Sequence, residues 1–125
     1  MSSFKKIVVE NTNEFYAKIE EAKQQASNVF VLFTGAGDPS WCGDCNRAHP
    51  VIEKVMKETT DSVLVECPCE REAYRDKQNF VYRKDNKIKL TCVPTLMNWS
   101  NPAIRLDDSQ SSQEDLVREL LLDDD

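Results

Sequence analysis

The chain has 125 residues, of which 40% are hydrophobic and 30% charged, a composition typical of a single globular domain covering residues 1–125. Its net charge of −6 argues against nucleic acid and anionic membranes as partners, and no apolar run is long enough for a transmembrane helix. The N-terminal apolar stretch is too short for a signal peptide, and five cysteines cannot all pair within one chain. We therefore expect a cytoplasmic protein in a reducing compartment, and a monomer.

The hydrophobic pattern predicts alternating strands and helices. Asn11 with Glu14, and Ser111 with Glu114, have the spacing of a capping box before a helix. The order of elements predicts an α/β fold with a central mixed β-sheet flanked by helices on both faces. In chain order we expect a strand at 5–9, a helix after Asn11, a buried strand at 28–34, a helix at 42–59, a strand at 62–66, one or two short helices within 70–89, a strand at 90–99 interrupted near its start by Pro94, a hairpin partner at 103–106 and a last helix that ends at 123–125.

A Cys-x-x-Cys pair, in the sequence Trp41-Cys42-Gly43-Asp44-Cys45, stands where the buried strand gives way to the next helix. Cys42 would lie at the helix N-terminus, where unpaired N–H groups and the positive end of the helix dipole stabilise a thiolate. Cys45 would follow in the first helical turn, near enough to close a short disulfide. Such a pair beside a βαβ pattern predicts a redox site.

Three features together resemble the thioredoxin family. They are Trp41-Cys42-x-x-Cys45, Pro50 eight residues after the first cysteine, and Val93-Pro94-Thr95 before an apolar strand. The resemblance covers nearly the whole chain and is strongest to a group of small cytosolic thioredoxin-related proteins. It implies a thioredoxin-like fold and a protein-disulfide reductase.

The resemblance also implies a role for each residue of the motif. Cys42 is the nucleophile that attacks a substrate disulfide, and Cys45 is the resolving cysteine that releases the reduced substrate. Gly43 and Asp44 tune the redox potential. Asp44 has opposing effects, because its charge suits a helix N-terminus but disfavours a second anion close to it.

The family's partners and binding residues carry over as expectations. The domain needs no bound cofactor, since thioredoxin reductase would reduce the cysteine bridge and use NADPH indirectly on its behalf. Substrates would be oxidised proteins or small-molecule disulfides. Val93, Pro94 in the cis form and Thr95 would bind an extended substrate chain opposite the cysteines, and Trp41 would form an apolar wall beside them.

Two other kinds of site compete with this interpretation. Cys42 and Cys45 could form a zinc site with Cys67 and Cys69, but the second pair is C-x-C and the first opens a helix, so we expect no metal. Alternatively, the fold could serve as an interaction or adaptor module that binds a partner without turnover. The presence of both thiols favours the enzyme.

Several residues near the motif have two interpretations. Cys67 and Cys69 are either buried thiols at a strand end or a regulatory disulfide. Cys92 is either a thiol on the rim of the site or a small strand residue. His49, the only histidine, is more simply packed or exposed than catalytic, and Trp99 is expected in the core.

The segment 71–89 carries seven Lys or Arg against three acidic residues, a local charge of +4 in a chain whose net charge is −6. The simplest interpretation is a solvated face. A second interpretation is that the segment borders the site and favours acidic substrates.

Overall fold

The computed structural model describes residues 4–122 and contains one five-stranded mixed sheet with the strand order β1-β3-β2-β4-β5. β3 runs parallel to both β1 and β2, whereas β4 runs antiparallel to β2 and to β5. The predicted α/β fold with a central mixed sheet is therefore confirmed. The strands are β1 (Phe4–Val8), β2 (Asn28–Gly35), β3 (Ser62–Cys69), β4 (Thr95–Asn98) and β5 (Arg105–Leu106).

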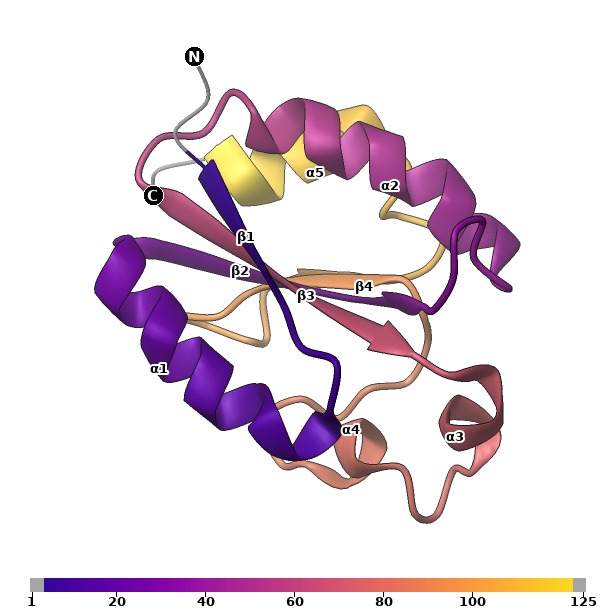
Figure 1. The fold of residues 1–125 in the computed structure, drawn as a ribbon. Coiled ribbons are helices and arrows are strands. Elements are labelled where there is room, and N and C mark those ends of the chain that lie inside the picture. Colours follow the sequence, from indigo (N-terminus) through magenta and orange to yellow (C-terminus); the bar gives the residue numbers. More distant parts are fainter. Residues whose placement is uncertain (1–3, 123–125) are drawn as a thin grey trace.

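Helices cover both faces of this sheet (Figure 1). One face carries α1, and the other carries α2 and α5, which contact each other. The two short helices expected between β3 and β4 are present. The helices are a 3₁₀ turn η1 (Thr12–Glu14), α1 (Phe15–Gln25), α2 (Gly43–Met56), α3 (Arg71–Arg75), α4 (Val81–Lys84) and α5 (Glu114–Leu122). None of the described helices is both long and apolar enough to cross a membrane.

Two hydrophobic cores fill the space between sheet and helices, because side chains of a strand alternate between its faces. The core under α1 is aromatic: the Phe33 ring lies 5.9 Å from that of Phe15 and 4.9 Å from that of Tyr82. Trp99 packs on Phe15 with ring centroids 5.3 Å apart, as expected for a core residue. The core under α2 and α5 is mainly aliphatic and includes Ile52, Val55, Leu64, Leu96 and Val117.

Two strand boundaries differ from the predictions by three residues or more. β3 continues through Pro68 to Cys69 instead of ending at Glu66. The pairing of β1 with β3 stops at Glu66, so Pro68 lies where β3 has a partner on one side only and its missing N–H is tolerated. β4 begins at Thr95 and not at residue 90, because residues 90–94 form a loop in which the Leu90 N–H donates to the Tyr82 carbonyl.

Neither predicted capping box forms. The Asn11 side chain makes no capping hydrogen bond, and its carbonyl instead accepts the Glu14 N–H within η1. The Ser111 hydroxyl donates to the Asp107 carbonyl at 2.7 Å, and α5 begins at Glu114 itself. The expected end of α5 at 123–125 lies outside the described residues.

Candidate functional site

The cysteine pair lies at the N-terminus of α2, as predicted. Cys42 is the N-cap residue, and its Sγ accepts the Cys45 N–H at 3.2 Å. That N–H is a donor that an anionic sulfur can use. On its other side the Cys42 thiol lies 3.6 Å from the Val93 carbonyl oxygen. The sulfur is thus held between a helix terminus and the loop that precedes β4.

Cys45 lies behind Cys42 and is 2% exposed, compared with 9% for Cys42. Its Sγ accepts the Gly35 N–H at 3.2 Å. Burial raises the pKa of the Cys45 thiol to about 12, and the nearby Cys42 adds to this rise, whereas hydrogen bonds from Thr34 and Gly35 oppose it. Cys45 is therefore a protonated thiol at neutral pH. This asymmetry suits Cys42 to the first attack and Cys45 to the resolving step.

The two residues between the cysteines are at the surface. Gly43 is the first residue of α2, and the Asp44 carboxylate in the first turn forms an exposed ion pair with the Arg47 guanidinium. A Cβ atom at Gly43 would meet Arg47 Nη1 at 3.6 Å, so the arginine lies beside both residues. Arg47 partly cancels the negative charge that Asp44 places near Cys42. The sequence contained a signal for this pair, since Asp and Arg three residues apart on a helix are neighbours.

Trp41 is anchored by its polar edge. The indole Nε1 donates to the Cys69 carbonyl at 2.9 Å, at the end of β3. The Trp41 ring lies 5.5 Å from that of Tyr74 in α3. Trp41 therefore forms a partly buried aromatic wall together with Tyr74, which no sequence motif marks as part of the site.

The segment before β4 completes the site. The Val93–Pro94 peptide is cis, as expected, and the Asp38–Pro39 peptide in the loop before Trp41 is also cis. Thr95 is buried, and its hydroxyl donates to the Cys92 carbonyl at 2.7 Å. Thr95 thus fixes the loop from within, while the Val93 carbonyl faces Cys42.

The remaining cysteines differ in accessibility. Cys67 and Cys69 are two residues apart on β3 and therefore lie on the same face of the strand. Both are fully buried in the core under α1. Burial raises the pKa of Cys69 to about 12 and that of Cys67 well above its ordinary value, so both are protonated thiols. Both cysteines are free and have almost no exposed surface, which favours buried thiols over a regulatory disulfide. Cys92 is only half-buried, with its Sγ 3.6 Å from Thr95 Oγ1.

One group of described residues brings potential metal ligands within 4.8 Å of one another, and it consists of His49, Glu53 and Glu66. The four cysteines of the zinc alternative do not form such a group, so the structure does not support that alternative. In the His49 group the Lys6 ammonium contacts both carboxylates and already supplies a positive charge. We therefore assign no metal to it.

The family model described as "Thioredoxin domain-containing protein 17-like, thioredoxin domain" matches residues 8–123. This chain belongs to that family. It is 31% identical to thioredoxin domain-containing protein 17 of Homo sapiens, in an alignment that covers 99% of this chain and 100% of the human protein. It is 37% identical to the thioredoxin-like protein Clot of Arabidopsis thaliana, over 83% of this chain and 82% of that protein. The resemblance expected from the sequence is thereby confirmed.

Solved thioredoxin structures share the fold of this family member. Thioredoxin O1 from Arabidopsis thaliana in the oxidised state superposes with a TM-score of 0.60 at 20% identity, covering 94% of this chain and 98% of the other. Thioredoxin f2 of Chlamydomonas reinhardtii gives a TM-score of 0.59 at 17% identity, covering 90% and 93%. The predicted thioredoxin-like fold is confirmed by both.

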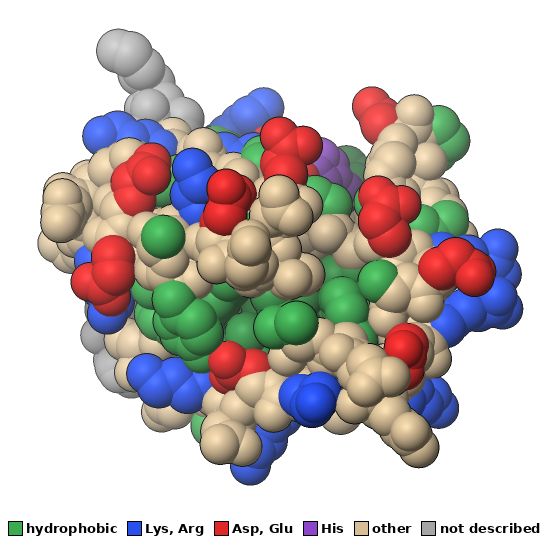
Figure 2. Space-filling view, turned by 60° about the horizontal axis from the view of Figure 1, so that its bottom comes forward, with side chains coloured by type: hydrophobic (Ala, Val, Ile, Leu, Met, Phe, Trp, Pro, Cys, Tyr) green, Lys and Arg blue, Asp and Glu red, His purple; other side chains and the backbone are tan. Residues whose placement is uncertain are grey.

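The basic segment 71–89 of this thioredoxin domain borders the site. The Arg83 guanidinium lies 4.2 Å above the ring of Tyr74, which also packs beside the rings of Trp41 and Phe80. Arg83 also donates to the carbonyls of Tyr74 at 2.9 Å and Thr91 at 3.3 Å, and so ties α3 and α4 to the loop before Pro94. Figure 2 shows Lys and Arg side chains along the right-hand edge, the side on which α3 lies in Figure 1, beyond a central hydrophobic area.

Proposed function

We propose that this chain is a cytosolic protein-disulfide reductase that works by dithiol–disulfide exchange through Cys42 and Cys45. The observation that carries the proposal is the asymmetry of the two sulfurs: Cys42 caps α2 and faces Val93, whereas Cys45 is a buried thiol behind it. Membership of a thioredoxin-type family supports a thiol–disulfide oxidoreductase. The reductase direction, the compartment and the recycling partner are parts of the proposal.

The proposed cycle transfers two electrons to the substrate. The Cys42 thiolate attacks one sulfur of the substrate disulfide, and the other sulfur leaves as a thiolate that takes a proton from solvent. Cys45 then loses its proton and attacks Cys42 Sγ. The Cys42–Cys45 bond forms, the bond to the substrate breaks, and the second substrate thiolate leaves. Thioredoxin reductase, with electrons from NADPH, restores the two thiols.

We expect NADPH to be consumed when the purified chain is added to thioredoxin reductase and cystine. The reason is that a helix-capping thiolate beside an intact resolving thiol can complete the cycle without another cofactor. The measurement is the loss of NADPH absorbance with time, and the control is the reductase with cystine alone.

The competing function is an adaptor that binds without turnover. It would be favoured if NADPH consumption stayed at the level of the control with both cystine and oxidised protein substrates while the thiols remained reduced. A rate that rises in proportion to the concentration of the chain supports the reductase.

The basic segment leads to a prediction about substrate choice. Replacing Arg71, Arg75, Lys77 and Lys84 with Gln should lower kcat/KM for an acidic protein disulfide roughly three- to tenfold at low salt, and less at high salt, because steering between exposed charges is screened. These four side chains are exposed. Neutral cystine should be reduced at an unchanged rate. Arg83 is retained, because its contacts hold α3 and α4 together.

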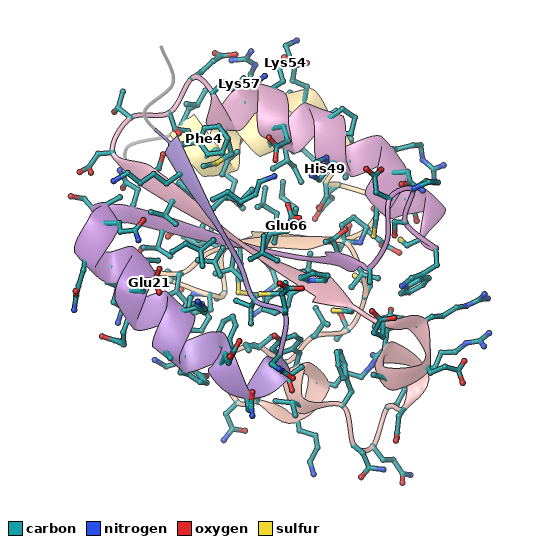
Figure 3. The ribbon with its side chains drawn as sticks, in the orientation of Figure 1. Phe4, Glu21, His49, Lys54, Lys57 and Glu66 are labelled. Atoms are coloured by element: carbon teal, nitrogen blue, oxygen red, sulfur yellow. The ribbon has the colours of Figure 1, made fainter. Side chains whose placement is uncertain are left out.

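A control with the same loss of charge replaces Lys5, Lys23, Lys54 and Lys57 with Gln. Lys54 lies in the last turn of α2 and Lys57 is its C-cap residue, at the end of the helix away from the cysteine pair (Figure 3). If kcat/KM for the acidic protein disulfide falls by the same factor in both variants, the net charge explains the effect and the position of the basic segment does not. If neither loses rate, the segment is only a solvated face.

A further inference from the structure

The Cys45 thiol must lose a proton during the resolving step of the proposed function, on which this inference rests. With a pKa of about 12, it is almost entirely protonated at neutral pH. The Cys45 residue is 2% exposed, so its thiol has little direct contact with bulk water. A buried thiol that attacks a disulfide in this way needs a proton acceptor close by, or a path to one.

A cavity of about 440 Å³ lies under the N-terminal half of α2, and Cys45 forms part of its wall. The same cavity is lined by His49, one helical turn after Cys45, and by Glu66 on β3. Its wall is more polar than apolar and its volume is sufficient for several water molecules. The cavity therefore connects the resolving thiol to a carboxylate.

Glu66 is held in this cavity with unused hydrogen-bonding capacity. Its Oε1 is buried, and lies 3.4 Å from His49 Nε2 and 3.5 Å from Lys6 Nζ, both at ion-pair distance and neither with hydrogen-bond geometry. Figure 3 shows His49 on α2 and Glu66 on the sheet below it, facing the same space. Leu32, the residue beside Glu66 on β2, is apolar and buried, so β2 offers no acceptor at this level.

Ionisable side chains from the elements around the cavity lie near Glu66. Lys6 comes from β1, His49 and Glu53 come from α2, and Asp38 comes from the exposed loop before the motif. Burial lowers the pKa of Lys6, but its close interactions with the Glu53 and Glu66 carboxyl groups outweigh this and raise the pKa overall. Lys6 thus stays charged and contacts the carboxyl groups of both Glu53 and Glu66, so this single ammonium is shared between two acidic side chains.

We infer that Glu66 accepts the Cys45 proton through water in the cavity beneath α2 and so sets the rate of the resolving step. In this step the Cys45 S–H bond breaks, the proton passes to the Glu66 carboxylate, and Cys45 Sγ forms its bond to Cys42 as the substrate thiolate leaves. The proton later returns to solvent. His49 and Lys6 are positioning residues that hold the carboxylate toward the cavity.

The test separates the two chemical steps with the chromogenic reagent dithiobis(nitrobenzoate). All proteins carry Cys92→Ser, so that only the cysteine pair reacts in the folded chain. The attack of Cys42 releases one coloured thiolate, and the attack of Cys45 on the mixed disulfide releases a second. Stopped-flow absorbance therefore records two phases. Glu66→Gln should leave the first phase unchanged and slow the second at least about tenfold.

The pH dependence gives a readout that a purely structural role would not alter. Without a local acceptor, the second phase should accelerate about tenfold for each pH unit, because the thiolate fraction of a group with a pKa of about 12 rises by that factor. We expect this slope in Glu66→Gln between about pH 7 and 9 and a nearly constant second phase in the parent protein. Glu66→Asp, which keeps a carboxylate in the cavity, should restore most of the rate.

Glu53→Gln is the matched control. Glu53 also contacts Lys6 and His49 and is similarly buried, but the cavity is lined by Glu66 and not by Glu53. An unchanged second phase in Glu66→Gln, or an equal loss in Glu53→Gln, overturns the inference. So does a second phase in the parent protein that itself rises tenfold per pH unit, even where Glu66→Gln does not fold. The absence of any second phase in the parent protein would instead overturn the proposed function.

Discussion

Cys42→Ser is expected to lower disulfide reduction by at least about a thousandfold, because a serine hydroxyl at this position cannot replace the thiolate nucleophile. Cys45→Ser is also expected to abolish turnover, but in a different way. Its Cys42 still attacks, and without the resolving thiol the substrate remains attached as a mixed disulfide. Intact-mass measurement after mixing with an oxidised protein substrate distinguishes the two variants, since only Cys45→Ser should show the adduct.

Cys92→Ser is the control for this pair of variants. Cys92 is the one cysteine that is not buried, and its replacement should leave turnover close to that of the parent protein. If Cys42→Ser trapped the substrate and Cys45→Ser did not, the nucleophile and the resolving cysteine would have to be exchanged.

Gly35→Ala is expected to disrupt the site although it adds only one methyl group. A Cβ atom at Gly35 would lie 2.5 Å from Ser40 Oγ, 2.9 Å from Cys42 Cβ and 2.9 Å from Trp41 Cε2. Ser40 can rotate away, but the Ser40 hydroxyl also accepts the Cys42 N–H at 3.0 Å. We expect a loss of about 1–3 kcal/mol in the free energy of unfolding, as for other overpacked sites, and an attack by Cys42 at least about tenfold slower.

Gly43→Ala is a control with the same chemical change at the first residue of α2, eight residues after the crowded position. Its Cβ would meet only the end of the flexible Arg47 side chain, at 3.6 Å. Because Ala favours a helix more than Gly by up to about 1 kcal/mol, this variant should be as stable as the parent protein or slightly more so. Denaturant unfolding and the first phase of the chromogenic reaction test both variants. If Gly35→Ala had the stability and the first-phase rate of the parent protein, the neighbouring residues would be able to shift and accommodate the added methyl group.

The local parts of the fold could be predicted from the sequence because local rules determine them. The apolar run at 28–34 forms a strand buried on both faces, and the loop after it delivers Cys42 to the start of α2. The loop at 90–94 was wrongly predicted as strand because its residues are apolar, and what keeps them out of the sheet is contact with α4. The capping box at Ser111 was also wrongly predicted, because the Ser111 hydroxyl donates instead to the Asp107 carbonyl.

The site was only partly predictable. The cysteines, Trp41 and Pro94 form motifs that can be recognised along the chain, and Arg47 could have been found from its helical spacing to Asp44. Tyr74 and Arg83 reach the site through α3 and α4, whose packing no short-range pattern encodes. The position of Glu66 beneath α2 depends on the register of β3 against β2, which a list of hydrophobic residues does not fix.

The buried thiols of Cys67 and Cys69 can report on local opening of the folded chain. Both thiols are buried in β3 and protonated, so an alkylating reagent can modify them only when that strand separates from its neighbours. The rate of their alkylation under native conditions therefore measures the free energy of this opening without any introduced reporter. The same burial protects both thiols from oxidation to sulfenic and sulfinic acids. In the intact chain we therefore expect such oxidation at Cys42 and Cys92.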